Sequence, residues 1–133
     1  MSRAAIVVMG LTALTLVAAC HEVSPEQQAA EAAQGYYQRL LDGYPDGFLE
    51  GKTTYAEMPE DYRKQLLEAG KQYLEDMQQR HDGLRAVAIS PNVGRMDSTL
   101  QLTYAFLLLS YGDSTQEEVA VPMVQVEGSW KMR

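Results

Sequence analysis

The sequence predicts an α+β fold in which N-terminal helices pack on a curved antiparallel sheet of three to four strands. Two observations support this prediction. Apolar residues recur at helical spacing as far as residue 83, whereas the period changes to two from residue 84 onwards. Short turn sequences separate the later segments, and such turns favour an antiparallel meander.

The first helix is expected to begin at Pro25. Ser24 can cap it, proline suits the first helical position, and Gln27 completes a capping box. Apolar and aromatic residues then follow on one face at helical spacing: Ala29, Ala33, Tyr36 and Leu40. Gly43 is expected to end this helix.

A turn and a second long helix are expected next. The segment 44–47 has turn chemistry, because proline fixes φ and glycine allows positive φ. Phe48 and Leu49 are expected to form a short helical turn into the core, followed by a loop over 51–57. The second long helix is expected from Met58-Pro59 to His81-Asp82-Gly83. One face of it carries an apolar stripe: Tyr62, Leu66, Ala69, Tyr73 and Met77.

The remaining chain is expected to form strands joined by short turns. Their expected ranges are 84–89, 98–111, 115–126 and 129–132. Pro91-Asn92 is expected to end the first strand, and Gly112-Asp113 to turn the chain after the second. Because Pro122 lacks an N–H, we expect a bulge or a sheet edge at that position.

The second strand is apolar on both faces. We expect one face to pack on the helices: Leu100, Leu102, Tyr104, Phe106 and Leu108. The other face is too apolar for water: Ala105, Leu107, Leu109 and Tyr111. Either a second copy covers this face in a sheet-on-sheet homodimer, or the chain's own fourth strand or N-terminal tether does.

The N-terminus has the layout of a lipoprotein signal peptide. Arg3 precedes an apolar run over 4–19, and Leu16-Val17-Ala18-Ala19-Cys20 reads as a lipobox. The chain then divides into three parts: a cleaved signal peptide (1–19), a lipidated Cys20 with a short tether (20–24) and an α+β domain (25–133). Lipid chains on Cys20 would hold the protein on a bilayer.

Three alternatives to the lipobox remain. They are a transmembrane helix, an ordinary signal peptide with a chance cysteine, and a buried helix. The run is shorter than the about 20 apolar residues that span a bilayer. By the sorting rule of Gram-negative lipoproteins, His21 in place of Asp favours the outer membrane. We therefore expect a lipid-anchored protein of the cell envelope.

Charge and composition exclude several classes of function. The net charge of −7 argues against nucleic acid and anionic headgroups as partners. With one cysteine there is no intramolecular disulfide, and lipidation would use up its thiol. The two histidines lie far apart, and no pattern typical of metal ligands or of a catalytic nucleophile occurs. We expect no cofactor, no metal and no catalytic residue.

The order of elements resembles a known family. Its marks are a lipobox, a helix with Tyr36-Tyr37, Asp46-Gly47-Phe48, Tyr111-Gly112-Asp113, and a closing Gly128-Ser129-Trp130-Lys131. These resemble small bacterial lipoproteins with a nuclear transport factor 2-like (cystatin-like) domain, over about residues 25–133. The resemblance implies a cone-shaped cavity between helices and sheet. It assigns no catalytic residue, because the superfamily holds isomerases and dehydratases beside binding and assembly domains.

Seven aromatic residues are candidates to line that cavity, with core packing as the alternative reading: Tyr37, Tyr44, Phe48, Tyr62, Tyr73, Tyr104 and Phe106. We expect a non-catalytic domain that binds a small amphipathic ligand or an envelope protein. The alternatives are an assembly subunit that acts through its sheet face and a small isomerase- or dehydratase-like enzyme. The expected inward face of the second strand carries no carboxylate or histidine, and Glu118 is the nearest mid-strand acid.

Overall fold

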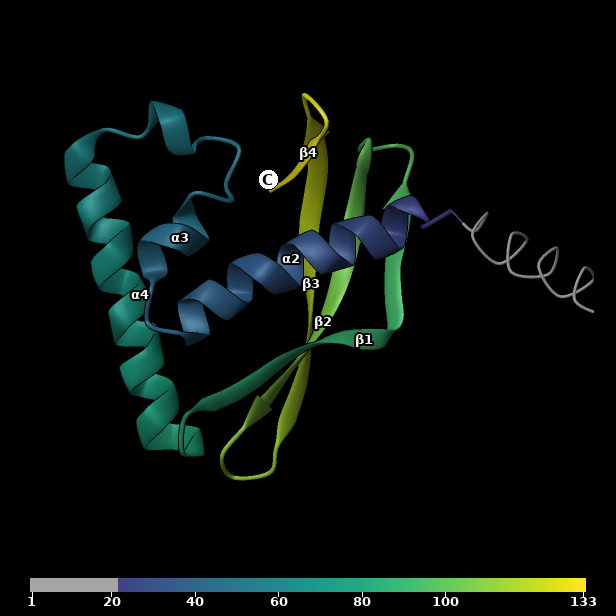
Figure 1. Cartoon of the computed structure of the whole chain (residues 1–133). Helices are drawn as coiled ribbons and strands as arrows, with labels where there is room; N and C mark the ends of the chain where they lie inside the picture. Colours follow the sequence, from purple (N-terminus) through teal and green to yellow (C-terminus); the bar gives the residue numbers. More distant parts are fainter. Residues whose placement is uncertain (1–21) are drawn as a thin grey trace, which may run out of the picture.

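The computed structural model describes residues 22–133, so the expected signal peptide and Cys20 lie outside the described residues. Helices come first and a four-stranded antiparallel sheet of order β1-β2-β3-β4 follows (Figure 1). The α+β prediction is therefore confirmed. Within 22–133, none of the helices combines the length and the apolar character that crossing a bilayer requires.

Helix α2 (Pro25–Leu41) lies across the sheet and begins as predicted. The Ser24 hydroxyl accepts the N–H of Gln27 at 3.1 Å. The Gln27 side chain donates to Glu31 at 3.0 Å, so one half of the capping box forms. Fully buried alanines face the sheet: Ala29, Ala30 and Ala33. Because these side chains are small, the helix can approach the strands closely.

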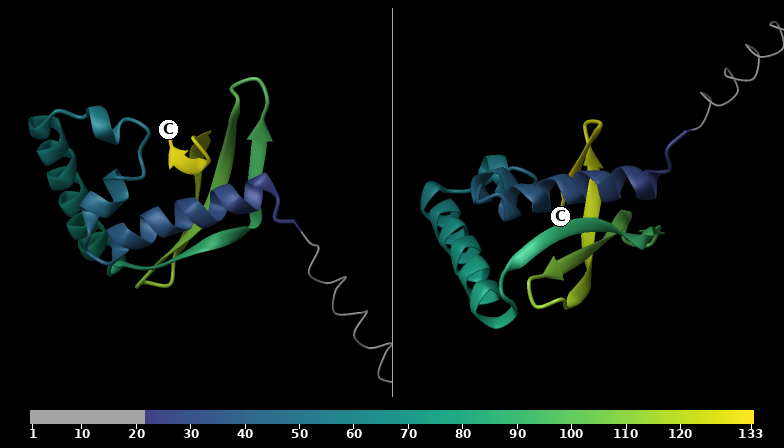
Figure 2. Two further views of the ribbon diagram at one scale, coloured as in Figure 1. Left: turned by 45° about the horizontal axis from the view of Figure 1, so that its top comes forward. Right: turned by 60° about the horizontal axis from the view of Figure 1, so that its bottom comes forward.

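Helices α3 (Pro45–Leu49) and α4 (Glu60–His81) match the sequence prediction closely, and the expected loop between them contains a 3₁₀ turn, η1 (Tyr55–Glu57). Asp82 caps the C-terminus of α4 with a φ of 58°. The helix stands beside the end of α2 (Figures 1 and 2). Met77 is its one buried residue, so the rest of its apolar stripe is half-buried or exposed.

The strands β1 (Leu84–Asp97), β2 (Leu102–Tyr111), β3 (Gln116–Val126) and β4 (Ser129–Met132) form a meander. The first hairpin is longer than predicted. Pro91-Asn92 does not end β1 but lies in an irregularity of pairing between Ile89 and Gly94. The turn follows Asp97, whose carboxylate accepts the N–H groups of Thr99 and Leu100 at 3.0 Å.

Pro122 occupies a local edge. The β2 pairing continues regularly through Pro122 and Tyr104. The Pro122 carbonyl accepts the N–H of Arg133 at 2.9 Å, just beyond the last β3–β4 pair. The N and C=O of one strand residue point to the same neighbour. The position where Pro122 lacks an N–H therefore faces the side where β4 has ended. This agrees with the predicted sheet edge and not with the predicted bulge.

The predicted faces of β2 are wrong. The residues assigned to an exposed dimer face lie in the core, at 0% to 7% exposure: Ala105, Leu107, Leu109 and Tyr111. Tyr104, Phe106 and Leu108, expected inside, are half-buried on the opposite, convex face, and Leu100 is 52% exposed in the turn before the strand. Leu102, from the same predicted face, is buried at 7% exposure. The sheet-on-sheet dimer loses its proposed contact residues, because α2 covers them.

The pairing with β3 sets which face of β2 is buried. Leu107 pairs with Val119, and Ala105 pairs with Val121. Directly paired residues share a face, so the apolar positions of β3 place those of β2 against the helices. On β2 alone, three consecutive leucines (107–109) make both faces apolar, and alternation cannot decide between them.

Candidate functional site

A largely apolar cavity of about 440 Å³ opens between α4, the end of α2, α3 and the strands β2 and β3. We call it the α4 cleft. Its lining comes from five elements and the segment after α3: Tyr37, Leu40, Pro45, Phe48, Leu49, Lys52, Leu66, Ala69, Gly70, Tyr73, Leu109, Glu117 and Val119. Helix α4 thus forms one wall of the cleft, and α2, α3 and the strands form the others.

Close contacts fix the walls of the cleft. The rings of Tyr37 and Phe48 meet edge to face, with 5.2 Å between their centres. A Cβ added at Gly70 would lie 3.5 Å from Pro45, so α4 comes near α3 at a residue without a side chain. Burial, with a smaller contribution from the neighbouring Tyr73, raises the pKa of Tyr37. Tyr37 is therefore a neutral phenol in the cleft wall.

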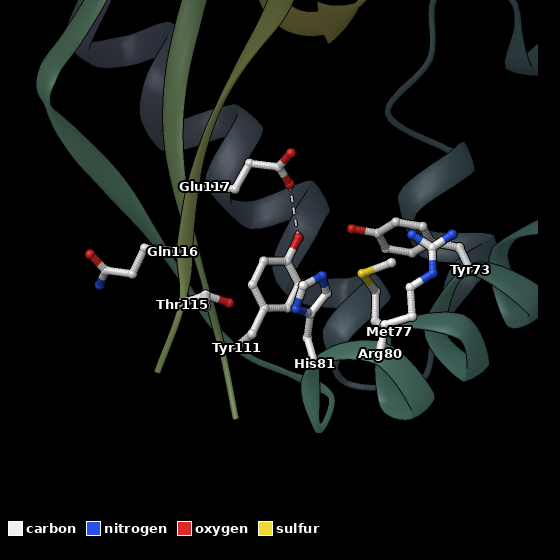
Figure 3. A pocket seen from close by; sticks show the side chains of 8 residues that line it. All are labelled: Tyr73, Met77, Arg80, His81, Tyr111, Thr115, Gln116 and Glu117. Carbon is white, nitrogen blue, oxygen red and sulfur yellow. Dashed lines mark hydrogen bonds between the residues drawn. The ribbon is translucent and has the colours of Figure 1, made fainter. Parts of the chain in front are cut away.

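A second, more polar cavity of about 430 Å³ adjoins the α4 cleft and shares Tyr73 and Glu117 with it (Figure 3). We call it the polar mouth. The other residues that line it are Met77, Arg80, His81, Tyr111, Thr115 and Gln116. Cationic and acidic side chains thus gather at one end of an apolar cleft.

Tyr111 and His81 organise the polar mouth. The Tyr111 hydroxyl donates to Glu117 at 2.9 Å (Figure 3), and the His81 ring lies 4.9 Å from the Tyr111 ring. Nδ1 of His81 lies 2.8 Å from a carboxylate oxygen of Asp113. Burial, followed by the contacts with Tyr73 and Glu117, raises the pKa of Tyr111. The phenol therefore remains a hydrogen-bond donor across the physiological pH range.

Asp113, the partner of His81 beside the mouth, has a strongly perturbed carboxylate. The Thr115 hydroxyl, 2.5 Å away, and then His81 lower its pKa to about 2. We expect Thr115→Val to raise this pKa toward the ordinary value of about 3.9, because valine removes the hydroxyl donor. Thr54→Val, at an exposed threonine elsewhere, should leave it unchanged. Carboxyl NMR titration measures both variants.

The same depressed pKa gives a pH dependence of stability. Its contribution is present above the unfolded-state pKa of about 3.9 and is lost as the pH falls through about 2. In Thr115→Val the folded-state pKa of Asp113 should be higher, so its contribution to stability should be smaller. The loss of that contribution should also be complete at a higher pH than in the wild type. An unchanged Asp113 titration in Thr115→Val would contradict the assignment.

The structure brings three of the seven aromatic candidates together in the α4 cleft: Tyr37, Phe48 and Tyr73. The others lie elsewhere. Tyr44 and Tyr62 are 51% and 50% exposed. Tyr104 lies on the convex face under the guanidinium of Arg95, at 5.3 Å, and Phe106 is half-buried on that face.

Two charged residues of the α4 cleft, Glu117 and Lys52, were not predicted from the sequence. Glu117, near the start of the strand expected over 115–126, lies on the concave face opposite Leu109 and lines the cleft. Its alternation with Val119 and Val121 could have revealed this. Lys52 was treated as part of a loop. Glu118, the acid considered earlier, lies on the opposite face from Glu117, where the Ser90 hydroxyl and then Asn92 lower its pKa.

Among residues 22–133, no group of three or more side chains of the metal-binding types is placed to hold an ion. Polar side chains of the mouth already have partners instead, since Tyr111 donates to Glu117, His81 contacts Asp113 and Arg80 contacts Asp76. The arrangement can therefore bind by hydrogen bonds and apolar contact.

The sequence matches no protein-family model and no curated protein. A solved structure from Campylobacter jejuni, provisionally named a nuclear transport factor 2-like transpeptidase, is similar in fold. The TM-score is 0.59 at 8% sequence identity, over 77% of this chain and 94% of that chain. At this identity the similarity shows the fold alone, and the predicted nuclear transport factor 2-like α+β fold is confirmed.

Proposed function

We propose that this domain binds a small amphipathic ligand in the α4 cleft without transforming it. The observation that carries the proposal is a cavity of about 440 Å³ with a mostly apolar lining and few charged groups. Ligand sites in proteins have this size and this composition. The incompletely buried apolar stripe of α4 also supports the proposal, because a bound apolar chain would shield these side chains from water.

The charges in the cleft support orientation of a ligand. Lys52 and Glu117 are the charged residues of its lining. Glu117 lies where the cleft meets the polar mouth, and it already accepts the Tyr111 hydroxyl. An amphiphile could therefore place its chain among apolar side chains and its head at a charged end. Saturable binding of one decanoate or decanol per chain, measured by calorimetry, tests this function.

The activity named for the structural neighbour is not part of the proposal. At 8% identity, the two chains share a fold that hosts unrelated functions. An isomerase- or dehydratase-like reaction would need a poised acid or base at a bound substrate. Glu117 is the carboxylate of the described cleft, and it is exposed.

We further propose that the domain works on a membrane of the cell envelope, held by lipid on Cys20 and in the outer membrane by the sorting rule for His21. The lipobox Leu16–Cys20 supports this. In the described chain, only residues 22–24 precede α2, so the tether would be short. The cleft would then meet ligands close to a bilayer.

Replacing Cys20 with Ser should release the full chain from the membrane fraction of a bacterial host, because serine cannot carry the thioether-linked lipid. Cell fractionation and metabolic labelling with a radioactive fatty acid measure this. Cys20→Ala should behave in the same way, and Ala56→Ser, at an exposed site, should remain labelled and membrane-bound. A Ser variant that keeps its label and its place in the membrane contradicts the anchor.

A further inference from the structure

Lys52 is a half-buried cation in the wall of the α4 cleft. Its ammonium lies 5.8 Å from the centre of the Phe48 ring, which also lines the cleft. The ion pairs formed within residues 22–133 do not include Lys52. A cation at an apolar cavity is costly to desolvate unless an anion joins it.

The backbone around Lys52 is held firmly. The N–H of Lys52 donates to Leu49 at 2.9 Å, at the end of α3. On either side, the Gly51 carbonyl accepts the N–H of Met132 at 2.7 Å, and Thr53 donates to the Met132 carbonyl at 2.9 Å. Strand β4 therefore fixes the point from which the lysine side chain extends, and the ammonium lies near Phe48 of α3.

The opposite charge in the cleft is already engaged. Glu117 accepts the Tyr111 hydroxyl at 2.9 Å and is solvent-exposed, near Arg80 and His81 of the polar mouth. Water and these neighbours can satisfy it. Lys52 is thus the charged group of the cleft for which a ligand can supply the missing counter-charge.

We propose that the ligand of the α4 cleft is a single-chain amphiphile with an anionic head group, carboxylate or phosphate ester. The head group pairs with the Lys52 ammonium, and the chain lies against Leu66, Ala69 and Tyr73. This inference rests on the proposed function and deepens it by naming the class of ligand. The proposed function requires only an amphipathic ligand, whereas this inference also requires that its head group be anionic. An experiment can therefore contradict the inference and leave the proposed function intact.

Three ligands with the same ten-carbon chain test the inference by calorimetry: decanoate, neutral decanol and cationic decyltrimethylammonium. The protein is the full chain with Cys20→Ser, so that no acyl group of its own competes for the cleft. We expect decanoate to bind about 10-fold more tightly than decanol, since hydrogen bonds to charged groups contribute more than neutral ones. Decyl phosphate, tested beside decanoate, distinguishes the two anionic heads.

The variant Lys52→Met keeps the length and apolar stem of the side chain and removes its charge. It should reduce decanoate affinity about 10-fold and leave decanol affinity unchanged. Lys71→Met makes the same charge change at an exposed residue of α4 outside the cleft and should leave both affinities unchanged. Equal loss with Lys71→Met would assign the effect to net charge and overturn the inference.

The other outcomes are equally decisive. If decanol binds as tightly as decanoate, the anionic head is wrong and the proposed binding function stands. If decyltrimethylammonium binds most tightly, Glu117 recognises the head and the inference is overturned. If none of the three ligands binds, the proposed function fails and the inference fails with it.

Discussion

Replacing Leu107 with alanine should lower the free energy of unfolding by about 2–5 kcal/mol. Leu107 is 0% exposed, and it lies between its cross-strand partners Ile89 and Val119, under the fully buried alanines of α2. Truncation leaves a cavity between a helix and a sheet, and neither backbone can easily move to fill it. Urea denaturation followed by circular dichroism measures the change.

The neighbouring leucines provide the controls for this prediction. Leu108→Ala removes the same atoms from the half-buried convex face and should cost less than Leu107→Ala. Leu100→Ala lies in the turn before β2, where the side chain is 52% exposed, and should change the unfolding free energy by no more than about 0.5 kcal/mol. A larger loss for Leu108→Ala than for Leu107→Ala would contradict the face assignment.

Replacing Ala69 with tryptophan should abolish ligand binding to the α4 cleft, with at least a 10-fold loss of affinity for decanoate and decanol alike. Ala69 lines the cleft on α4 and is itself exposed, so a large ring can enter the cavity without displacing core residues. The ring would occupy the space that the apolar chain of a ligand needs. Calorimetry measures the loss.

A matched substitution separates filling of the cleft from damage to the helix. Gln72→Trp adds the same ring to an exposed position of α4 that does not line the cleft. It should leave affinity unchanged. Both variants should keep the thermal unfolding midpoint within a few degrees, because surface substitutions change stability little. Wild-type affinity in Ala69→Trp would mean that ligands bind elsewhere.

Local sequence signals predicted the order and the ends of most elements. Ser24 caps α2, and Gly43 follows α2 with φ of 84°. These features depend on a few neighbouring residues, so they can be read from sequence. The exception is the first hairpin, where Pro91 lies inside β1. An irregular pairing absorbs the proline there, and its presence depends on the partner strand.

The candidate site was harder to predict because it depends on how elements face each other. Leu107, Leu108 and Leu109 are equally apolar, so β2 alone carries no information on which face is buried. The alternate large apolar residues of β3, Val119, Val121 and Met123, fix that choice through their pairing. Lys52 reaches the cleft only because β4 returns to pair beside the segment after α3, a contact between residues far apart in sequence.

The most direct test of the central claim is a methyl NMR titration of the Cys20→Ser chain with decanoate. The account predicts saturable shifts and ligand contacts at the methyl groups of Leu66, Ala69 and Val119, which line the α4 cleft. Methyl groups of Ala88 and Ala120, exposed on the convex face of the sheet, should not respond. Contacts at those two alanines with none in the cleft, or no saturable response at all, would contradict the account.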